Sequence, residues 1–116
     1  MNIWYLTSDL LFSSRVVAQA ERAGHAVIMV ASPALLADRF QQGSDEAPEL
    51  IVVDLTLPSL NVPEVIPKLR AAAPQAKILA YGPHVHTQAL AAAQAAGCDA
   101  VMSNGQFDRS LGEILK

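Results

Sequence analysis

A short apolar run that ends in a single carboxylate is the feature that most constrains the fold of this chain. Residues 50–53 read Leu-Ile-Val-Val, Asp54 follows, and residues 55–58 read Leu-Thr-Leu-Pro. A continuous run of this length predicts a strand buried on both faces, as at the centre of a parallel sheet. Ligands in open α/β sheets gather outside the carboxyl ends of the strands. We therefore expect Asp54 to lie at the edge of the sheet where a site would form.

Length, charge and cysteine content narrow the class of protein. The 116 residues suffice for one domain with a real hydrophobic core. A formal net charge of −3 provides no electrostatic reason to expect nucleic-acid binding by this domain. No apolar run approaches the roughly 18 residues of a membrane span, and the first residues lack the basic segment of a signal peptide. The single cysteine excludes an internal disulfide, so these observations together predict a cytoplasmic protein.

Apolar runs alternate with helical patterns along the whole chain. The runs predict strands over residues 2–6, 26–31, 50–54, 77–81 and 99–102. Helices are predicted over residues 10–23, from Asn61 to residue 73, over 87–96, and from an Asp108 cap to the end. A further helix is predicted to begin at Ser32-Pro33, to include Leu35, Leu36 and Phe40, and to end by Gly43. Pro67 leaves two alternatives for the helix after Asn61, which are a late start near Val65 or a kink.

This alternation predicts an α/β fold with a five-stranded parallel sheet and helices on both faces. Short right-handed connections favour the flavodoxin-like (βα)5 strand order 2-1-3-4-5. The topological switch point of this order lies between strands 1 and 3, so Thr7, Ser8 and Asp9 are expected beside Asp54. The last helix would have only about eight residues, fewer than average. Either it is naturally short, or residues 1–116 are the N-terminal part of a longer protein.

Three motifs resemble the receiver domains of bacterial two-component response regulators. Residues 54–58, Asp-Leu-Thr-Leu-Pro, are similar to the Asp-x-x-Met-Pro around the phosphorylated aspartate of that family. Residues 92–100, Ala-Ala-Gln-Ala-Ala-Gly-Cys-Asp-Ala, resemble its fourth helix and fifth strand, and Phe107-Asp108 resembles the start of its fifth helix. The resemblance covers the whole chain and implies a CheY-like fold.

The resemblance also implies a chemistry, in which the aspartate attacks a phosphoryl donor beside Mg²⁺. Asp54 takes the position of the phosphoacceptor. The acidic pair that holds the metal falls on Thr7 and Ser8, or on Ser8 and Asp9 with a shift of one residue. The conserved hydroxyl falls on Gly82, and the lysine with its following proline falls on Asn104 and Gly105. If each lost contact is worth about 2–4 kcal/mol, phosphorylation would be slower by several orders of magnitude.

These replacements predict a degenerate pseudo-receiver that is not an enzyme, needs no cofactor, and acts by phosphorylation-independent protein contact in a signalling system. For Asp54 itself, the alternative to phosphoacceptance is a structural role, in which the carboxylate caps neighbouring backbone N–H groups with Thr7 or Ser8. An ordinary phosphoacceptor receiver, with Mg²⁺, is the first alternative for the whole domain.

A flavodoxin-like small-molecule binder is the further alternative. Thr7 and Ser8 at a helix N-terminus could receive a phosphate, although the glycine-rich loop of such sites is missing. His84 and His86 alternate in a loop near the same edge, which is a weak pattern for a metal site. The prediction is that no metal binds there.

The helix over 87–96 contains no charged residue. An uncharged face of small residues could meet a partner closely, although alanine is also simply the best helix former. The candidate interface residues are Gln88, Ala91, Ala92 and Ala95. The resemblance places partner contacts on the face made by the fourth helix, fifth strand and fifth helix. We expect a kinase, an output domain or a second copy there. Cys98, Trp4 and Tyr5 are expected in the core.

Overall fold

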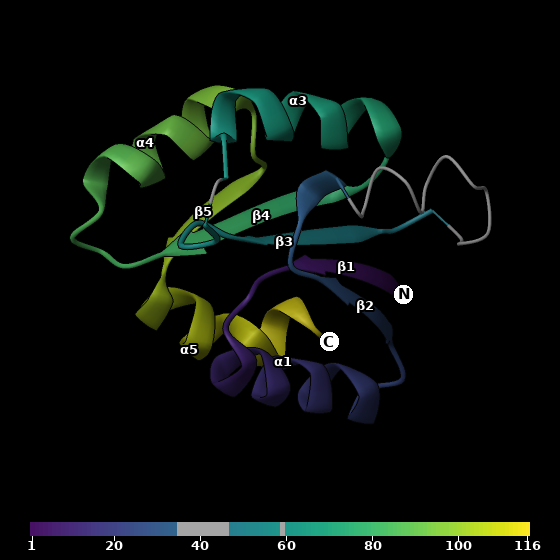
Figure 1. The fold of residues 1–116 in the computed structure, drawn as a ribbon. Helices are drawn as coiled ribbons and strands as arrows, with labels where there is room; N and C mark the ends of the chain where they lie inside the picture. Colours follow the sequence, from purple (N-terminus) through teal and green to yellow (C-terminus); the bar gives the residue numbers. More distant parts are fainter. Residues whose placement is uncertain (35–46, 59) are drawn as a thin grey trace.

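The computed structural model of the protein describes residues 1–34, 47–58 and 60–116, and they form three layers (Figure 1). A parallel sheet in the order β2-β1-β3-β4-β5 lies between two layers of helices, which confirms the predicted order. The strands are β1 Asn2–Leu6, β2 Ala26–Val30, β3 Leu50–Asp54, β4 Lys77–Gly82 and β5 Ala100–Ser103. The helices are α1 Leu10–Arg22, α3 Val62–Ala72, α4 Thr87–Ala96 and α5 Asn104–Ile114. The helix expected to include Leu35, Leu36 and Phe40 lies outside the described residues from residue 35 on.

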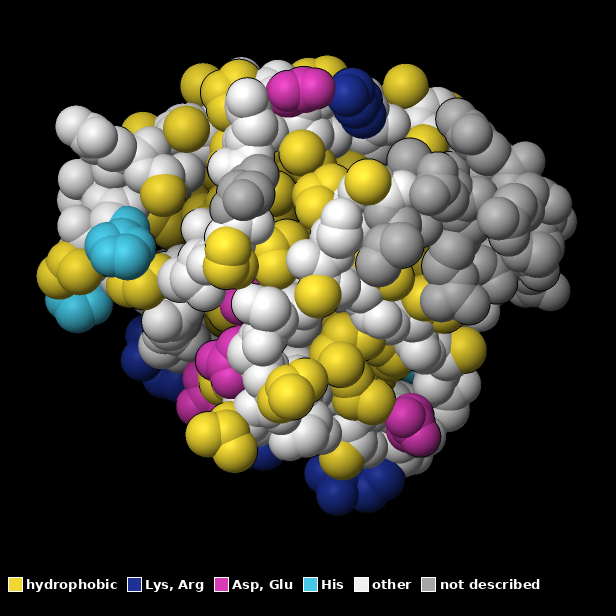
Figure 2. All heavy atoms as spheres, in the orientation of Figure 1, with side chains coloured by type: hydrophobic (Ala, Val, Ile, Leu, Met, Phe, Trp, Pro, Cys, Tyr) yellow, Lys and Arg dark blue, Asp and Glu magenta, His cyan; other side chains and the backbone are white. Residues whose placement is uncertain are grey.

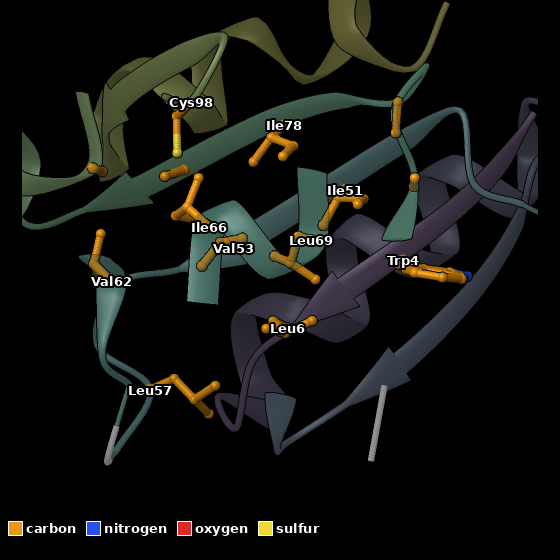
Figure 3. Packing of buried hydrophobic residues seen from close by; sticks show 14 of the residues in the cluster. Trp4, Leu6, Ile51, Val53, Leu57, Val62, Ile66, Leu69, Ile78 and Cys98 are labelled. Carbon is orange, nitrogen blue, oxygen red and sulfur yellow. The ribbon is translucent and has the colours of Figure 1, made fainter. Parts of the chain in front are cut away.

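Two hydrophobic clusters cover the two faces of the sheet, because successive side chains of each buried strand point to opposite faces. Ile51 and Val53 of β3 belong to the cluster beneath α3 and α4, which Figure 3 shows in close-up. Leu50 and Val52 belong to the cluster beneath α1 and α5. All five residues of β3 are buried, which confirms the reading of this stretch as a central strand.

The expected core residues are where the sequence predicted them. Trp4 and Tyr5 are buried in β1, on opposite faces of the sheet. Cys98 packs in the cluster beneath α3 and α4 (Figure 3), and burial raises the pKa of its thiol to about 11, with a further contribution from the neighbouring Asp99 carboxylate. This thiol is therefore protonated and poorly reactive at neutral pH.

The structure excludes one alternative for the start of α3 and corrects the predicted start of α5. The helix α3 begins at Val62, where the Asn61 side chain accepts the Glu64 N–H, and it continues through Pro67, so the late start near Val65 is wrong. The helix α5 begins at Asn104 rather than after Asp108. Its N-cap is Ser103, which forms a reciprocal capping box with Gln106. With 11 residues α5 has an average length, so the short helix that suggested an interrupted element is not observed.

One polar cluster joins three elements at the amino edge of β4. Asp99 accepts the backbone N–H of Ile78 at 2.8 Å and a bond from the Arg70 guanidinium at 2.6 Å, and Arg70 also donates to the carbonyl of Ala76. The Ile78 N–H first, and then Arg70, hold the pKa of the Asp99 carboxyl below its usual value. The cluster ties α3 and the α4–β5 connection to the sheet.

The surface view in Figure 2 shows hydrophobic side chains across the middle of one face, with most of the acidic and basic side chains around its periphery. None of the helices in the described part of the chain is long and apolar enough to cross a membrane.

Candidate functional site

Asp54 ends β3 and is only 3% exposed. Both of its carboxylate oxygens already accept hydrogen bonds. Oδ2 accepts from the Thr7 hydroxyl at 2.7 Å, while Oδ1 accepts from the Thr56 backbone N–H at 2.9 Å and from the Thr56 hydroxyl at 2.7 Å. The carboxylate therefore caps the turn that follows β3, as the structural interpretation of Asp54 expects.

Only one of the three polar residues after β1 contacts Asp54. Thr7 is 2% exposed, and its hydroxyl donates to Asp54 while accepting the Asp9 N–H at 3.1 Å. Ser8 is exposed. Asp9 is also exposed, and its Oδ1 caps α1 by accepting the N–H groups of Leu11 and Phe12 at 3.1 Å each. The position resembling the acidic pair therefore presents a hydroxyl to Asp54.

Gly82, at the position of the family hydroxyl, is buried at the end of β4, next to Tyr81, which pairs with Asp54. A Cβ at residue 82 would lie 3.2 Å from the Leu55 Cβ, which is closer than such atoms normally approach. A threonine or serine would therefore require Leu55 to move. The close packing of Leu55 therefore suits glycine at this position.

Asn104, at the position of the family lysine, is exposed in the first turn of α5. It follows β5, which is separated from β3 by β4, so the two strand ends are about 10 Å apart. Asn104 makes no hydrogen bond to Asp54, whose side-chain partners are Thr7 and Thr56. Gly105, where the family has proline, lies in the same turn of α5.

An aromatic cluster that the sequence did not predict lies on the same face of the sheet as Asp54. The Tyr81 ring stacks on Phe107 with centroids 4.2 Å apart, and Phe12 of α1 contacts both rings. The hydroxyls of Tyr81 and Tyr5 are 2.6 Å apart. Burial raises the pKa of both phenols, and the Asp54 carboxylate adds to both shifts. The alternation of side chains along the strands could have indicated this cluster, because Tyr81 of β4 is the register partner of Asp54 in β3 and therefore lies on the same face of the sheet.

The two loop histidines do not converge with other ligands. His84 and His86 are exposed in the β4–α4 connection, and His86 occupies the N-cap of α4 without a side-chain capping bond. Among residues 1–34, 47–58 and 60–116, no three His, Cys, Asp or Glu side chains come together in a group that could hold a metal ion.

The candidate interface residues of α4 separate into two sets. Gln88, Ala91 and Ala95 are exposed. Ala92 is partly buried and packs against the core, so it is displaced from the outer face on which the sequence interpretation grouped it. The outer face of α4 therefore presents small, uncharged side chains.

Several solved structures that are similar to this chain are response regulators. A response regulator from Burkholderia pseudomallei, solved with a phosphorylated aspartic acid, matches with a TM-score of 0.77 and 22% identity over 99% of this chain and 66% of its own. The receiver domain of the TMAO respiratory response regulator TorR matches with a TM-score of 0.83 and 19% identity, over 98% of this chain and 92% of its own. The chemotaxis regulator CheY4 of Vibrio cholerae has a TM-score of 0.76 and 14% identity, over 98% and 94%. The fold is thus that of the receiver domains, as the resemblance implied.

The sequence family is a different one from the family that the motifs indicated. The family described as "CoA binding domain" matches residues 8–105, and the chain belongs to this family. No curated protein sequence matches the chain. The receiver resemblance is therefore confirmed for the fold, while the family match links the sequence to a second class of α/β domain.

Proposed function

We propose that this chain is a receiver-like signalling domain that acts by protein contact without phosphorylation of Asp54. The observation that carries the proposal is the Asp54 carboxylate, which is buried and accepts bonds on both oxygens from Thr7 and Thr56. A nucleophilic carboxylate must present an oxygen to the phosphoryl donor, and here the carboxylate is buried and both of its oxygens already accept hydrogen bonds.

The surroundings of Asp54 add to this argument. Phosphoryl transfer depends on cations and donors that neutralise the charge on the transferred group. Among the residues that the structure describes, no lysine or arginine hydrogen-bonds to Asp54. Gly82 carries no hydroxyl, and Asn104 carries no charge. Asp9 is the acidic residue among the three polar residues that follow β1, and its carboxylate caps α1. We expect Mg²⁺ to bind only if Asp54 is a phosphoacceptor, which is the alternative to this proposal.

The partner in this proposal is another protein that meets the face containing α4, β5 and α5. The outer residues Gln88, Ala91 and Ala95 would allow close backbone approach, and the neighbouring Val85 is 68% exposed. A kinase, an output domain or a second copy of the chain are the candidates.

The chemistry is tested by incubating the protein with acetyl phosphate and Mg²⁺ and measuring its intact mass. We expect no gain of a phosphoryl group in the unmodified protein or in Asp54→Asn. A stoichiometric gain that Asp54→Asn abolishes would instead establish the ordinary phosphoacceptor.

The contact surface is tested with Ala91→Glu, using Ala18→Glu as the matched control, since Ala18 is an exposed alanine on α1. We expect Ala91→Glu to weaken self-association or partner capture and Ala18→Glu to leave it unchanged. Equal behaviour of the two variants would remove α4 from the proposal.

A second candidate function, CoA binding, is favoured by the family match over residues 8–105. The geometry is less favourable to it at the α1 N-terminus, because Asp9 already occupies the N–H groups of Leu11 and Phe12 that would receive a phosphate. Calorimetric titration with CoA decides between the two. Saturable binding that persists when Asp54 is replaced by asparagine would favour the binder, and no heat of binding would favour the signalling domain.

A further inference from the structure

A cavity of about 210 Å³ opens at the amino edge of the sheet, opposite to the edge that carries Asp54. Its floor is apolar and comes from four elements, β3, β4, β5 and α5. Leu50 and Leu79 of the sheet are buried there, and Met102 of β5 and Ile114 of α5 are partly buried beside them. Met1 completes the apolar wall. Methionine side chains adapt to irregular shapes, so two of the walls can adjust to a ligand.

Three charged residues line the same cavity, and their signs differ. Lys77 begins β4, Glu49 precedes β3, and Glu113 lies in the last turn of α5. Within the described part of the chain Lys77 makes no ion pair, whereas Glu113 has a long contact of 3.8 Å with Lys116. The carbonyl end of α5 adds partial negative charge next to Glu113.

The walls of this cavity are held together by a histidine. His25, in the turn between α1 and β2, accepts a bond from the Met1 amino group at Nδ1 over 2.9 Å. Its Nε2 donates to the Leu115 carbonyl at the end of α5 over 2.8 Å. This bridge fixes the start of β1 against the end of α5, which are two of the segments that line the cavity. The bridge holds the backbone of these two segments in place, which lowers the conformational entropy lost on binding, while the methionine side chains remain adaptable.

We propose that this cavity binds a free α-amino acid with an aliphatic side chain. The ligand carboxylate would pair with Lys77, the ligand ammonium with Glu49 and Glu113 at the helix end, and the side chain would lie on Leu50 and Leu79. The cavity is smaller than the roughly 300–1,000 Å³ of sites for drug-sized molecules, so a small ligand fits it. A fatty acid would bring its carboxylate near two glutamates, and a simple amine would meet Lys77. Only a zwitterion with an apolar body matches all three charges and the floor.

The proposal is tested by NMR titration of the full chain with L-leucine, isocaproic acid, which lacks the amine, and isopentylamine, which lacks the carboxylate. We expect saturable shifts at Leu79, Met102 and Ile114 with leucine at up to about 10 mM, and binding at least about tenfold weaker for both analogues. Lys77→Gln should weaken leucine binding by at least about threefold. The matched control Lys68→Gln, on α3, should leave it unchanged.

Absence of saturable shifts with leucine would overturn the proposal. So would equal binding of leucine and isocaproic acid, or Lys77→Gln behaving like Lys68→Gln. Because the cavity and Asp54 lie at opposite edges of the sheet, none of these outcomes depends on whether Asp54 accepts a phosphoryl group.

Discussion

Replacing Thr7 with valine removes one hydroxyl from the Asp54 site while keeping the shape of the side chain. The Thr7 hydroxyl is buried, donates to Asp54 Oδ2 at 2.7 Å and accepts the Asp9 N–H at 3.1 Å. In the valine variant Oδ2 loses the donor that the structure gives it. If Asp54 is a structural cap, this loss must appear as lost stability.

The expected magnitude follows from these two bonds. A hydrogen bond to a carboxylate contributes about 1.5–3 kcal/mol, and a neutral one about 0.5–1.5 kcal/mol. The additional buried methyl group of valine offsets about 0.8 kcal/mol. We therefore expect Thr7→Val to lower the free energy of unfolding by about 2 kcal/mol, which corresponds to roughly 8 °C in Tm for a chain of this size.

The measurement is urea unfolding at neutral pH, followed by circular dichroism, with the m-value checked for constancy. Thr87→Val is the control, because Thr87 is exposed at the start of α4 and should change the free energy of unfolding by less than about 0.5 kcal/mol. A double-mutant cycle with Asp54→Asn should show a coupling of about 1 kcal/mol, since the two side chains share one bond. A Thr7→Val effect as small as that of the control, or a coupling near zero, would refute the reasoning.

Three further predictions concern other parts of the chain. Tyr5 and Tyr81 are the only tyrosines, and burial raises the pKa of both phenols above the ordinary 10.0. Their contribution to stability is therefore complete below pH 10 and is lost as the pH rises through the raised values. In an alkaline titration, tyrosinate absorbance should appear only together with unfolding. Because the folded protein lowers the pKa of Asp99, Asp99→Asn should have a smaller free energy of unfolding than the parent protein at neutral pH. This difference in the free energy of unfolding should shrink as the pH falls through the lowered pKa, which unfolding measurements at a series of acid pH values would show. Gly97 has φ +106, so Gly97→Ala should cost about 1–2 kcal/mol in urea unfolding, whereas Gly112→Ala within α5 should stabilise the protein by about 0.5–1 kcal/mol.

Much of the fold is predictable because hydrophobic period and turn residues report local structure directly. The run before Asp54 predicts a central strand, and β3 is buried throughout. The predicted Asp108 cap of α5 is wrong, although the sequence contains the true signal, because Ser103 and Gln106 stand at the spacing of a capping box. Pro67 was harder, because proline disfavours a helix interior, yet Ile66 and Leu69 bury the helix against the core.

The Asp54 site was only partly predictable. Thr7, Ser8 and Asp9 were expected near Asp54, but their roles follow from side-chain direction at the end of β1. Thr7 lies on the face of the sheet that carries Tyr5 and Asp54, whereas Asp9 is the cap of α1. The loss of the acidic pair was visible in the sequence. The replacement of that pair by a buried hydroxyl bonded to Asp54 was not visible there.

The sequence alone determined the alternation of strands and helices and the position of Asp54 at a strand end, because hydrophobic period and turn residues are local signals. It also predicted the parallel order 2-1-3-4-5, through the general preference for short right-handed connections. Only the tertiary structure decided what surrounds Asp54. The bond from Thr7, the stacked rings of Tyr81 and Phe107, and the close approach of Leu55 to Gly82 join parts of the chain that are distant in sequence, whereas the bonds from Thr56 belong to the local turn after β3. Strand register and packing bring these groups together, and neither can be read from a local pattern.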